Sequence, residues 1–206
     1  STYLNSSLSN LIGVNFHHFV SRDLFYDVRL SYYRYTFFRS VNGWSPDRYT
    51  FPTFRTFDNS LFYSSMSSTV YEDQTTQAYT VKGDVTWQID RFNLVKGGLE
   101  LKANDLDYYY IANPVNPSDQ TRNIYRKKPL EGSAYLQDKI EFETIILNLG
   151  LRFDFFDAST PYLTDPFNPA STTNTKRQAS VSPRVGIAYP VLENMVFHFA
   201  YGKFFQ

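Results

Sequence analysis

Long stretches of this sequence alternate apolar and polar residues with a period of two, and this pattern constrains the fold more than any other feature. From Ile145 to Phe155 every odd position holds Ile, Leu or Phe, while Asn148, Gly150, Arg152 and Asp154 occupy even positions. Successive side chains point to opposite faces of a β-strand, so such a segment has one apolar and one polar face. The pattern predicts an all-β chain. Similar alternation recurs at 26–33, 79–89, 181–189 and 197–202.

The predicted strands are joined by connections of two kinds that alternate. The periodicity predicts eight strands, at about 8–20, 24–38, 77–89, 93–110, 130–142, 144–157, 178–189 and 195–206. Short turns fall near 21–23, 90–91, 141–143 and 190–194, and long Pro-, Ser- and Asn-rich connections at roughly 39–76, 111–129 and 158–177. Outer-membrane barrels have short periplasmic turns and longer outer loops. The alternation of short and long connections therefore predicts an antiparallel transmembrane β-barrel wall.

Hydropathy fits a barrel and excludes a helical membrane protein. The chain of 206 residues has a mean hydropathy of -0.39, and its longest apolar clusters are interrupted within a few positions. A transmembrane helix needs about 20 consecutive apolar residues, whereas a barrel strand needs only about 9 to 11 with one apolar face. The 18% aromatic content is also typical of strands and of membrane interfaces.

Charge and cysteine content exclude several other classes. Twenty Lys and Arg balance twenty Asp and Glu, so there is no electrostatic case for a nucleic-acid partner. The absence of cysteine excludes disulfides and thiolate metal sites. The first residues have neither a basic region nor an apolar stretch, so we expect no signal peptide in this sequence.

The order of turns also predicts where the two ends of the chain lie. The first and last predicted strands both place their free ends on the long-loop side, whereas a complete single-chain barrel is expected to keep both termini in the periplasm. We therefore expect residues 1–206 to be a partial outer-membrane β-barrel domain. The alternative is a self-contained eight-stranded barrel with inverted termini.

Two hairpins resemble a known family. Residues 133–142 (SAYLQDKIEF) and 147–154 (LNLGLRFD) resemble the "AYxQD…NxGxRxD" hairpin of TonB-dependent outer-membrane receptors. Residues 182–190 (SPRVGIAYP) and 197–206 (FHFAYGKFFQ) look like the "SPRxGxxYP" and "YGxFFQ" hairpin that often follows it. The resemblance covers the second half of the chain well, whereas the hairpins of the first half fit the family only loosely.

The resemblance implies a cell outer-membrane location in a Gram-negative cell and a 22-stranded barrel closed by an N-terminal plug. It also implies import of a ligand with energy coupled from the inner membrane by TonB. The expected partners are the lipid bilayer, the missing barrel strands and plug of the same protein, TonB through the plug, and an imported ligand. This sequence lacks a plug, a TonB box and sufficient strands, so no ligand-binding residue is transferred from the family.

Two groups of residues are candidates for a functional role. The first group contains polar residues that we assign to the lumen of the barrel. We expect them to pair with each other and with a plug, or to take part directly in ligand passage. They are Lys82, Arg152, Asp154 and Arg184. The second group contains aromatic residues of a long connection. Exposed loop aromatics can bind sugars, peptides or hydrophobic solutes, and the alternative is that these residues form a lid or an extra strand. The group is Trp44, Tyr49, Phe51 and Phe54.

Catalysis and metal binding have little support in the sequence. Ser, His and Asp are present, but no Gly-x-Ser-x-Gly elbow or comparable motif appears, so we expect no enzyme activity. His17 and His18 point to opposite faces of a strand and cannot ligate one metal together. We therefore predict neither a cofactor nor a metal site.

Three functions compete on this evidence. The first is part of a TonB-dependent import receptor. The second is a small structural or adhesive barrel complete in itself, which pairing between 8–20 and 195–206 would favour. The third is a soluble β-sandwich binding module, which would bury its apolar faces against each other.

Overall fold

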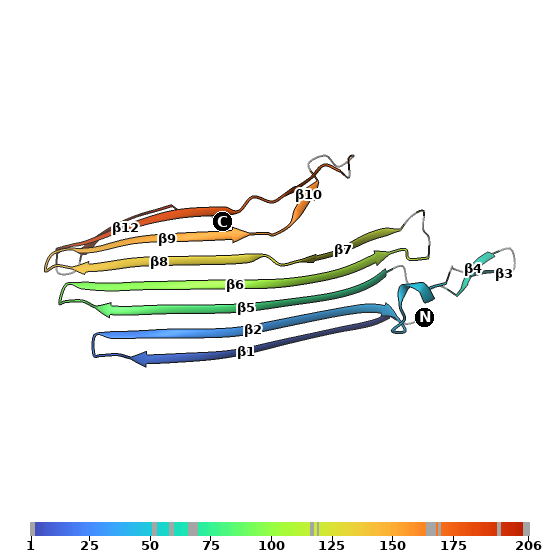
Figure 1. The fold of residues 1–206 in the computed structure, drawn as a ribbon, viewed down its shortest axis with the longest axis horizontal. Coiled ribbons are helices and arrows are strands. Elements are labelled where there is room, and N and C mark those ends of the chain that lie inside the picture. Colours follow the sequence, from blue (N-terminus) through green and yellow to red (C-terminus); the bar gives the residue numbers. More distant parts are fainter. Residues whose placement is uncertain are drawn as a thin grey trace. The chain divides into compact units, whose positions relative to one another are not determined.

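All eight predicted strands form, and they belong to one antiparallel sheet (Figure 1). The computed structural model describes residues 3–50, 53–57, 60–65, 70–115, 118, 120–163, 168, 170–192 and 195–203. The eight strands, in their order across the sheet, are β1 (Tyr3–Phe19), β2 (Leu24–Val41), β5 (Val70–Gln88), β6 (Asn93–Ala112), β8 (Leu130–Glu141), β9 (Ile146–Asp157), β12 (Gln178–Leu192) and β13 (Met195–Gly202). The predicted fold class is confirmed.

Additional short elements occur in the long connections. Strand β7 (Thr121–Lys127) pairs with β6 and is the ninth strand of the sheet. Strands β3 (Thr53–Phe57) and β4 (Ser60–Ser65) pair with each other, as do β10 (Pro161–Leu163) and β11 (Thr172–Asn174). The first pair shows that part of the connection at 39–76 forms extra strands. The short 3-10 helix η1 (Pro46–Arg48) precedes it.

The predicted alternation of short and long connections is confirmed. Residues 20–23, 89–92 and 142–145 form short links, and 193–194, which lie outside the described residues, are all that separates β12 from β13. The links at 42–69, 113–129 and 158–177 contain the additional elements. No helix in the described ranges is long and apolar enough to cross a membrane.

The strands carry different side chains on the two faces of the sheet. In one cross-strand row, Leu99, Ala134, Phe153 and Val181 lie side by side on β6, β8, β9 and β12. The adjacent row on the same strands is Glu100, Ser133, Asp154 and Ser180. Because neighbouring positions of a strand point to opposite sides, these rows define an apolar face and a polar face.

The apolar face is exposed rather than packed in a core. Leu136 is 61% exposed, Phe197 60% and Leu99 54%. A β-sandwich of two sheets would bury such residues between its layers. The soluble sandwich alternative is therefore wrong, and hydrocarbon is the medium that suits this face.

The chain divides into two compact units, and only small clusters of residues are buried in each. One unit comprises 1–11, 33–78 and 104–128, and the other 12–32, 79–103 and 129–206. In the first, Val41, Tyr49 and Ile111 are buried. The Tyr49 hydroxyl accepts a hydrogen bond from the Val41 N–H at 3.0 Å and donates one to the Val70 carbonyl at 3.5 Å. These bonds attach the segment after η1 to two strands.

An aspartate organises the short turn between β5 and β6. The Asp90 Oδ1 accepts hydrogen bonds from the N–H groups of Phe92, at 2.7 Å, and Asn93, at 2.9 Å. The Asn93 side chain donates to the same carboxylate. These donors favour the charged form and lower the pKa of Asp90 below its ordinary value, with the Phe92 N–H contributing most.

The first prediction concerns this turn. Because the folded-state pKa is lowered, the carboxylate stabilises the turn at pH values above its unfolded pKa and loses this effect as the pH falls through the folded pKa. Asp90→Ala should therefore lower the unfolding temperature of the full-length protein at neutral pH, and the gap should close as the pH falls below 3.8. Asp90→Asn retains an acceptor oxygen and does not titrate, so its advantage over Asp90→Ala should persist. A gap between Asp90→Ala and wild type that is independent of pH would contradict this assignment.

The second prediction tests the two faces with neighbouring residues of β5. Val85 is 39% exposed on the apolar face, and Thr86 follows it on the polar face. Val85→Arg should cost about 2 to 4 kcal/mol if the site lies near the bilayer midplane, because it places a cation against hydrocarbon. Thr86→Arg should cost much less. The free energy of unfolding of the full-length protein in liposomes measures both, and equal costs would show that the faces are assigned wrongly.

Candidate functional site

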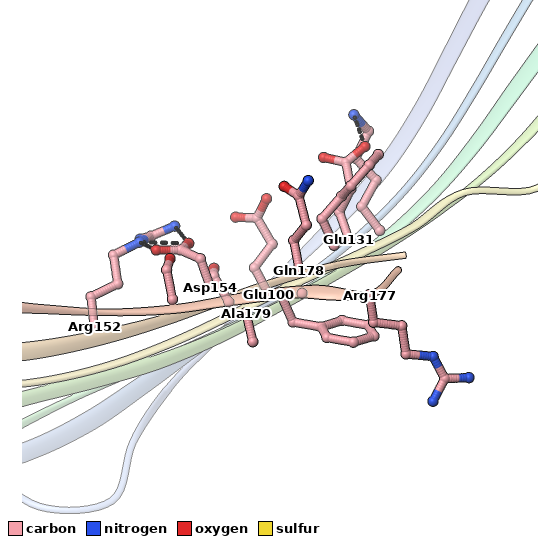
Figure 2. Close-up of a pocket in the computed structure, with 13 residues that line it drawn as sticks. Glu100, Glu131, Arg152, Asp154, Arg177, Gln178 and Ala179 are labelled. Carbon is pink, nitrogen blue, oxygen red and sulfur yellow. Dashed lines mark hydrogen bonds and ion pairs between the residues drawn. The ribbon is translucent and has the colours of Figure 1, made fainter. Parts of the chain in front are cut away.

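A polar cavity of about 640 Å³ lies over strands β6, β8, β9 and β12 (Figure 2). Figure 2 shows Glu100, Glu131, Asp154 and Gln178 on one side of the ribbon, whereas Arg177 extends to the other side. The polar-face residues that line the cavity are Glu100, Lys102, Glu131, Ser133, Arg152, Asp154, Phe156, Gln178 and Ser180. These residues form the candidate site, called here the polar cavity.

The strand register places the lining residues in straight cross-strand rows. Lys102 pairs with Glu131, Glu131 with Phe156, and Phe156 with Gln178. We call these four residues the Phe156 row. In the next row on this face, Glu100 pairs with Ser133, Ser133 with Asp154, and Asp154 with Ser180. The site is therefore built from regular strands, which position side chains more rigidly than loops.

Opposite charges on the polar face contact one another. Arg152 donates to Asp154 at 2.8 Å. The Lys82 Nζ lies 3.8 Å from an Asp84 carboxylate oxygen and 3.7 Å from one of Glu100. The Lys102 Nζ lies 3.5 Å from Glu131.

Most of these side chains are more than one third exposed, so each pair contributes at most about 1 kcal/mol to stability. Their main effect is to keep this part of the polar face nearly neutral.

The structure separates the four predicted polar residues. Arg152 and Asp154 line the cavity as an ion pair, and Lys82 contacts the cavity residue Glu100. Arg184 is paired in register with Gly150 on one side and Gly202 on the other, and it does not line the cavity. Glu100, Lys102, Glu131 and Gln178 are cavity residues that the sequence analysis did not single out.

The predicted loop aromatics occupy different environments. Trp44 is 38% exposed, whereas Tyr49 is buried and its hydroxyl bonds backbone groups. Phe51 lies outside the described residues. Phe54 lies in β3, and its side chain is outside the described part of the structure. A ligand-facing role for these aromatics therefore stays a prediction. Among those whose side chains the structure describes, Trp44 is exposed.

The two neighbouring histidines have separate contacts. The His17 Nδ1 lies 2.6 Å from an Asp27 carboxylate oxygen. The His18 ring makes an edge contact with Tyr26, with ring centroids 5.2 Å apart. Within the described ranges, no group of three or more His, Cys, Asp or Glu is arranged to hold a metal ion.

A contact beside the cavity joins three strands. The Tyr135 hydroxyl on β8 donates a hydrogen bond to Asp84 on β5 at 2.8 Å, across the intervening strand β6. The ring passes over Gly98, which is paired with Tyr135. A Cβ at Gly98 would lie 2.3 Å from the ring and 2.6 Å from the Asp84 carboxylate. A glycine inside a strand often marks such a close approach, and this signal could have been read from Gly97 and Gly98.

The fold and the site together define a class of protein. One antiparallel sheet has an exposed apolar face and a charged, cavity-bearing opposite face, and its short and long connections alternate. These are the features of a transmembrane β-barrel wall.

Comparison with protein families identifies the chain more closely. The model of the family "TonB dependent receptor-like, beta-barrel" matches residues 2–206, so the chain belongs to this family. It is an outer-membrane transporter family rather than an enzyme family. A comparison with curated proteins gave no match. The suspected family is therefore confirmed, and the match extends over the first half of the chain, where the resemblance was only general.

The third prediction tests the contact over Gly98. Gly98→Ala should destabilise the full-length protein by about 1 to 3 kcal/mol, because the added methyl group displaces the Tyr135 ring or the Asp84 carboxylate. Gly150→Ala is the matched control on β9, since its Cβ would meet its neighbours at 3.7 Å or more. Removing the ring with Tyr135→Ala should make Gly98→Ala much less costly. Unfolding free energies of the single and double variants measure this coupling, and additive effects would contradict it.

Proposed function

We propose that this chain forms part of the barrel wall of an outer-membrane receptor, and that this receptor imports a solute with energy supplied through TonB. The observation that carries the proposal is the sheet's exposed apolar face opposite a charged face, in a chain matched by the receptor barrel family. An exposed apolar face suits lipid, and a polar face suits a water-filled or plugged interior. The family membership supports transport rather than catalysis.

This proposal assigns each part of the wall a medium or a partner. The apolar face contacts the lipid bilayer of the outer membrane, and the long connections face the cell exterior. The polar face, with Lys82, Arg152, Asp154 and Arg184, faces the lumen, where a plug and the imported ligand meet it. Further strands of the same protein would complete the barrel, and TonB would act through the plug. The exposed Trp44 is proposed to face the ligand from a long connection.

The alternative of a small self-contained barrel has no comparable support. Pairing between β1 and β13 would favour it, and within the described residues the sheet order runs from β1 to β13 without such pairing. No second function is therefore proposed.

The fourth prediction tests the import role with three strains. The uptake of solutes from the growth medium is measured in three strains: wild-type cells, cells that lack the gene for this protein, and cells that lack TonB. At least one solute should be taken up only when both proteins are present, and the protein should fractionate with the outer membrane. Identical uptake in the first two strains, across media that induce the gene, would refute the import role.

A further inference from the structure

Phe156 interrupts the alternation of β9 and places an aromatic ring on the polar face. By strand position Phe153 and Phe155 belong to the apolar face, whereas Phe156 is on the polar face, paired in register with Glu131 and Gln178. Phe155 and Phe156 both line the cavity. The residue is 40% exposed. A single exposed apolar residue is common on ordinary surfaces. Here, however, the ring lies in a cavity whose other polar-face lining groups carry charges or hydrogen-bonding atoms.

Hydrogen-bonding groups flank the ring on both sides. Directly opposed residues of neighbouring strands have Cβ atoms about 4.5 to 5.5 Å apart, so the side chains of Glu131 and Gln178 leave the sheet on either side of Phe156. The Gln178 carboxamide offers two donors and one acceptor oxygen. The hydroxyls of Ser133 and Ser180 line the same cavity.

The charge of the row argues against a charged ligand. The Lys102 ammonium group already lies 3.5 Å from Glu131. The Phe156 row thus contains one cation and one anion, and its net charge is zero. A ligand that matches it needs an apolar surface for the ring and neutral polar groups at the edge of that surface.

We propose that the Phe156 row is a subsite for a neutral sugar ring. A pyranose has a face of C–H groups that stacks on an aromatic ring and a rim of hydroxyls that donate and accept hydrogen bonds. The C–H face would lie on Phe156, with hydroxyls donating to Glu131 and exchanging hydrogen bonds with Gln178. The cavity of about 640 Å³ is within the size range of small-molecule sites. This inference rests on the proposed import function and specifies its substrate class as carbohydrate.

The test uses the full-length receptor in detergent and a panel of neutral sugars: glucose, galactose, N-acetylglucosamine, maltose and cellobiose. Binding is measured by isothermal titration calorimetry and by saturation-transfer NMR. At least one sugar should bind, and Phe156→Ala should weaken its affinity about tenfold, whereas Phe156→Tyr should retain it. Phe153→Ala removes a neighbouring ring from the opposite face of the same strand and should leave affinity unchanged.

The outcomes separate this subsite from the import role. Absence of binding by every sugar, or equal binding by wild type and a folded Phe156→Ala variant, overturns the subsite. If TonB-dependent uptake of another solute persists in that case, the import function stands. Sugar binding that depends on Phe156, combined with uptake that does not require TonB, supports the subsite and overturns the import role.

Discussion

Pairing of backbone amides between neighbouring strands is the interaction on which the rest of this structure depends. A strand can present apolar side chains to hydrocarbon only when its own N–H and C=O groups are bonded to other strands, because lipid offers them no partner. The antiparallel ladders from β6 through β8, β9 and β12 to β13 satisfy this requirement over long, nearly uninterrupted registers. Those registers also bring residues from distant parts of the chain into the rows that form the polar cavity.

The ladder explains why small residues matter in this wall. Bulky side chains on both members of every pair would leave no room for a ring to lie along the sheet. Gly98 provides that room, so Tyr135 reaches Asp84 over an intervening strand. The contact joins β5 to β8 by a side-chain bond in addition to their separate ladders with β6. Such a bond favours one alignment of three strands, and alignment is what keeps the charged pairs and the Phe156 row in place.

The sequence predicts the main strands well because their signal is local. Alternation at 145–155 or 79–89 is visible in consecutive residues. Strand β7 lacks this signal, since its Thr, Arg, Asn and Lys residues form no continuous apolar face. The candidate site is harder to predict because its members meet through register. Arg152 and Asp154 are recognisable within one strand, whereas the Tyr135 contact spans 51 residues. Alternation alone places Phe155 and Phe156 on opposite faces, but it does not show that Glu131 and Gln178 flank Phe156, because that depends on register with two other strands.

The paired charges of the polar face also affect how a solute would move past it. Each of Lys82, Lys102 and Arg152 contacts at least one carboxylate. The electric fields of such close pairs decline within a short distance, since each pair is a dipole rather than a single charge. A dissolved molecule near this part of the wall therefore meets many hydrogen-bonding groups but little net attraction or repulsion. Contacts with this part of the wall should therefore change little with ionic strength.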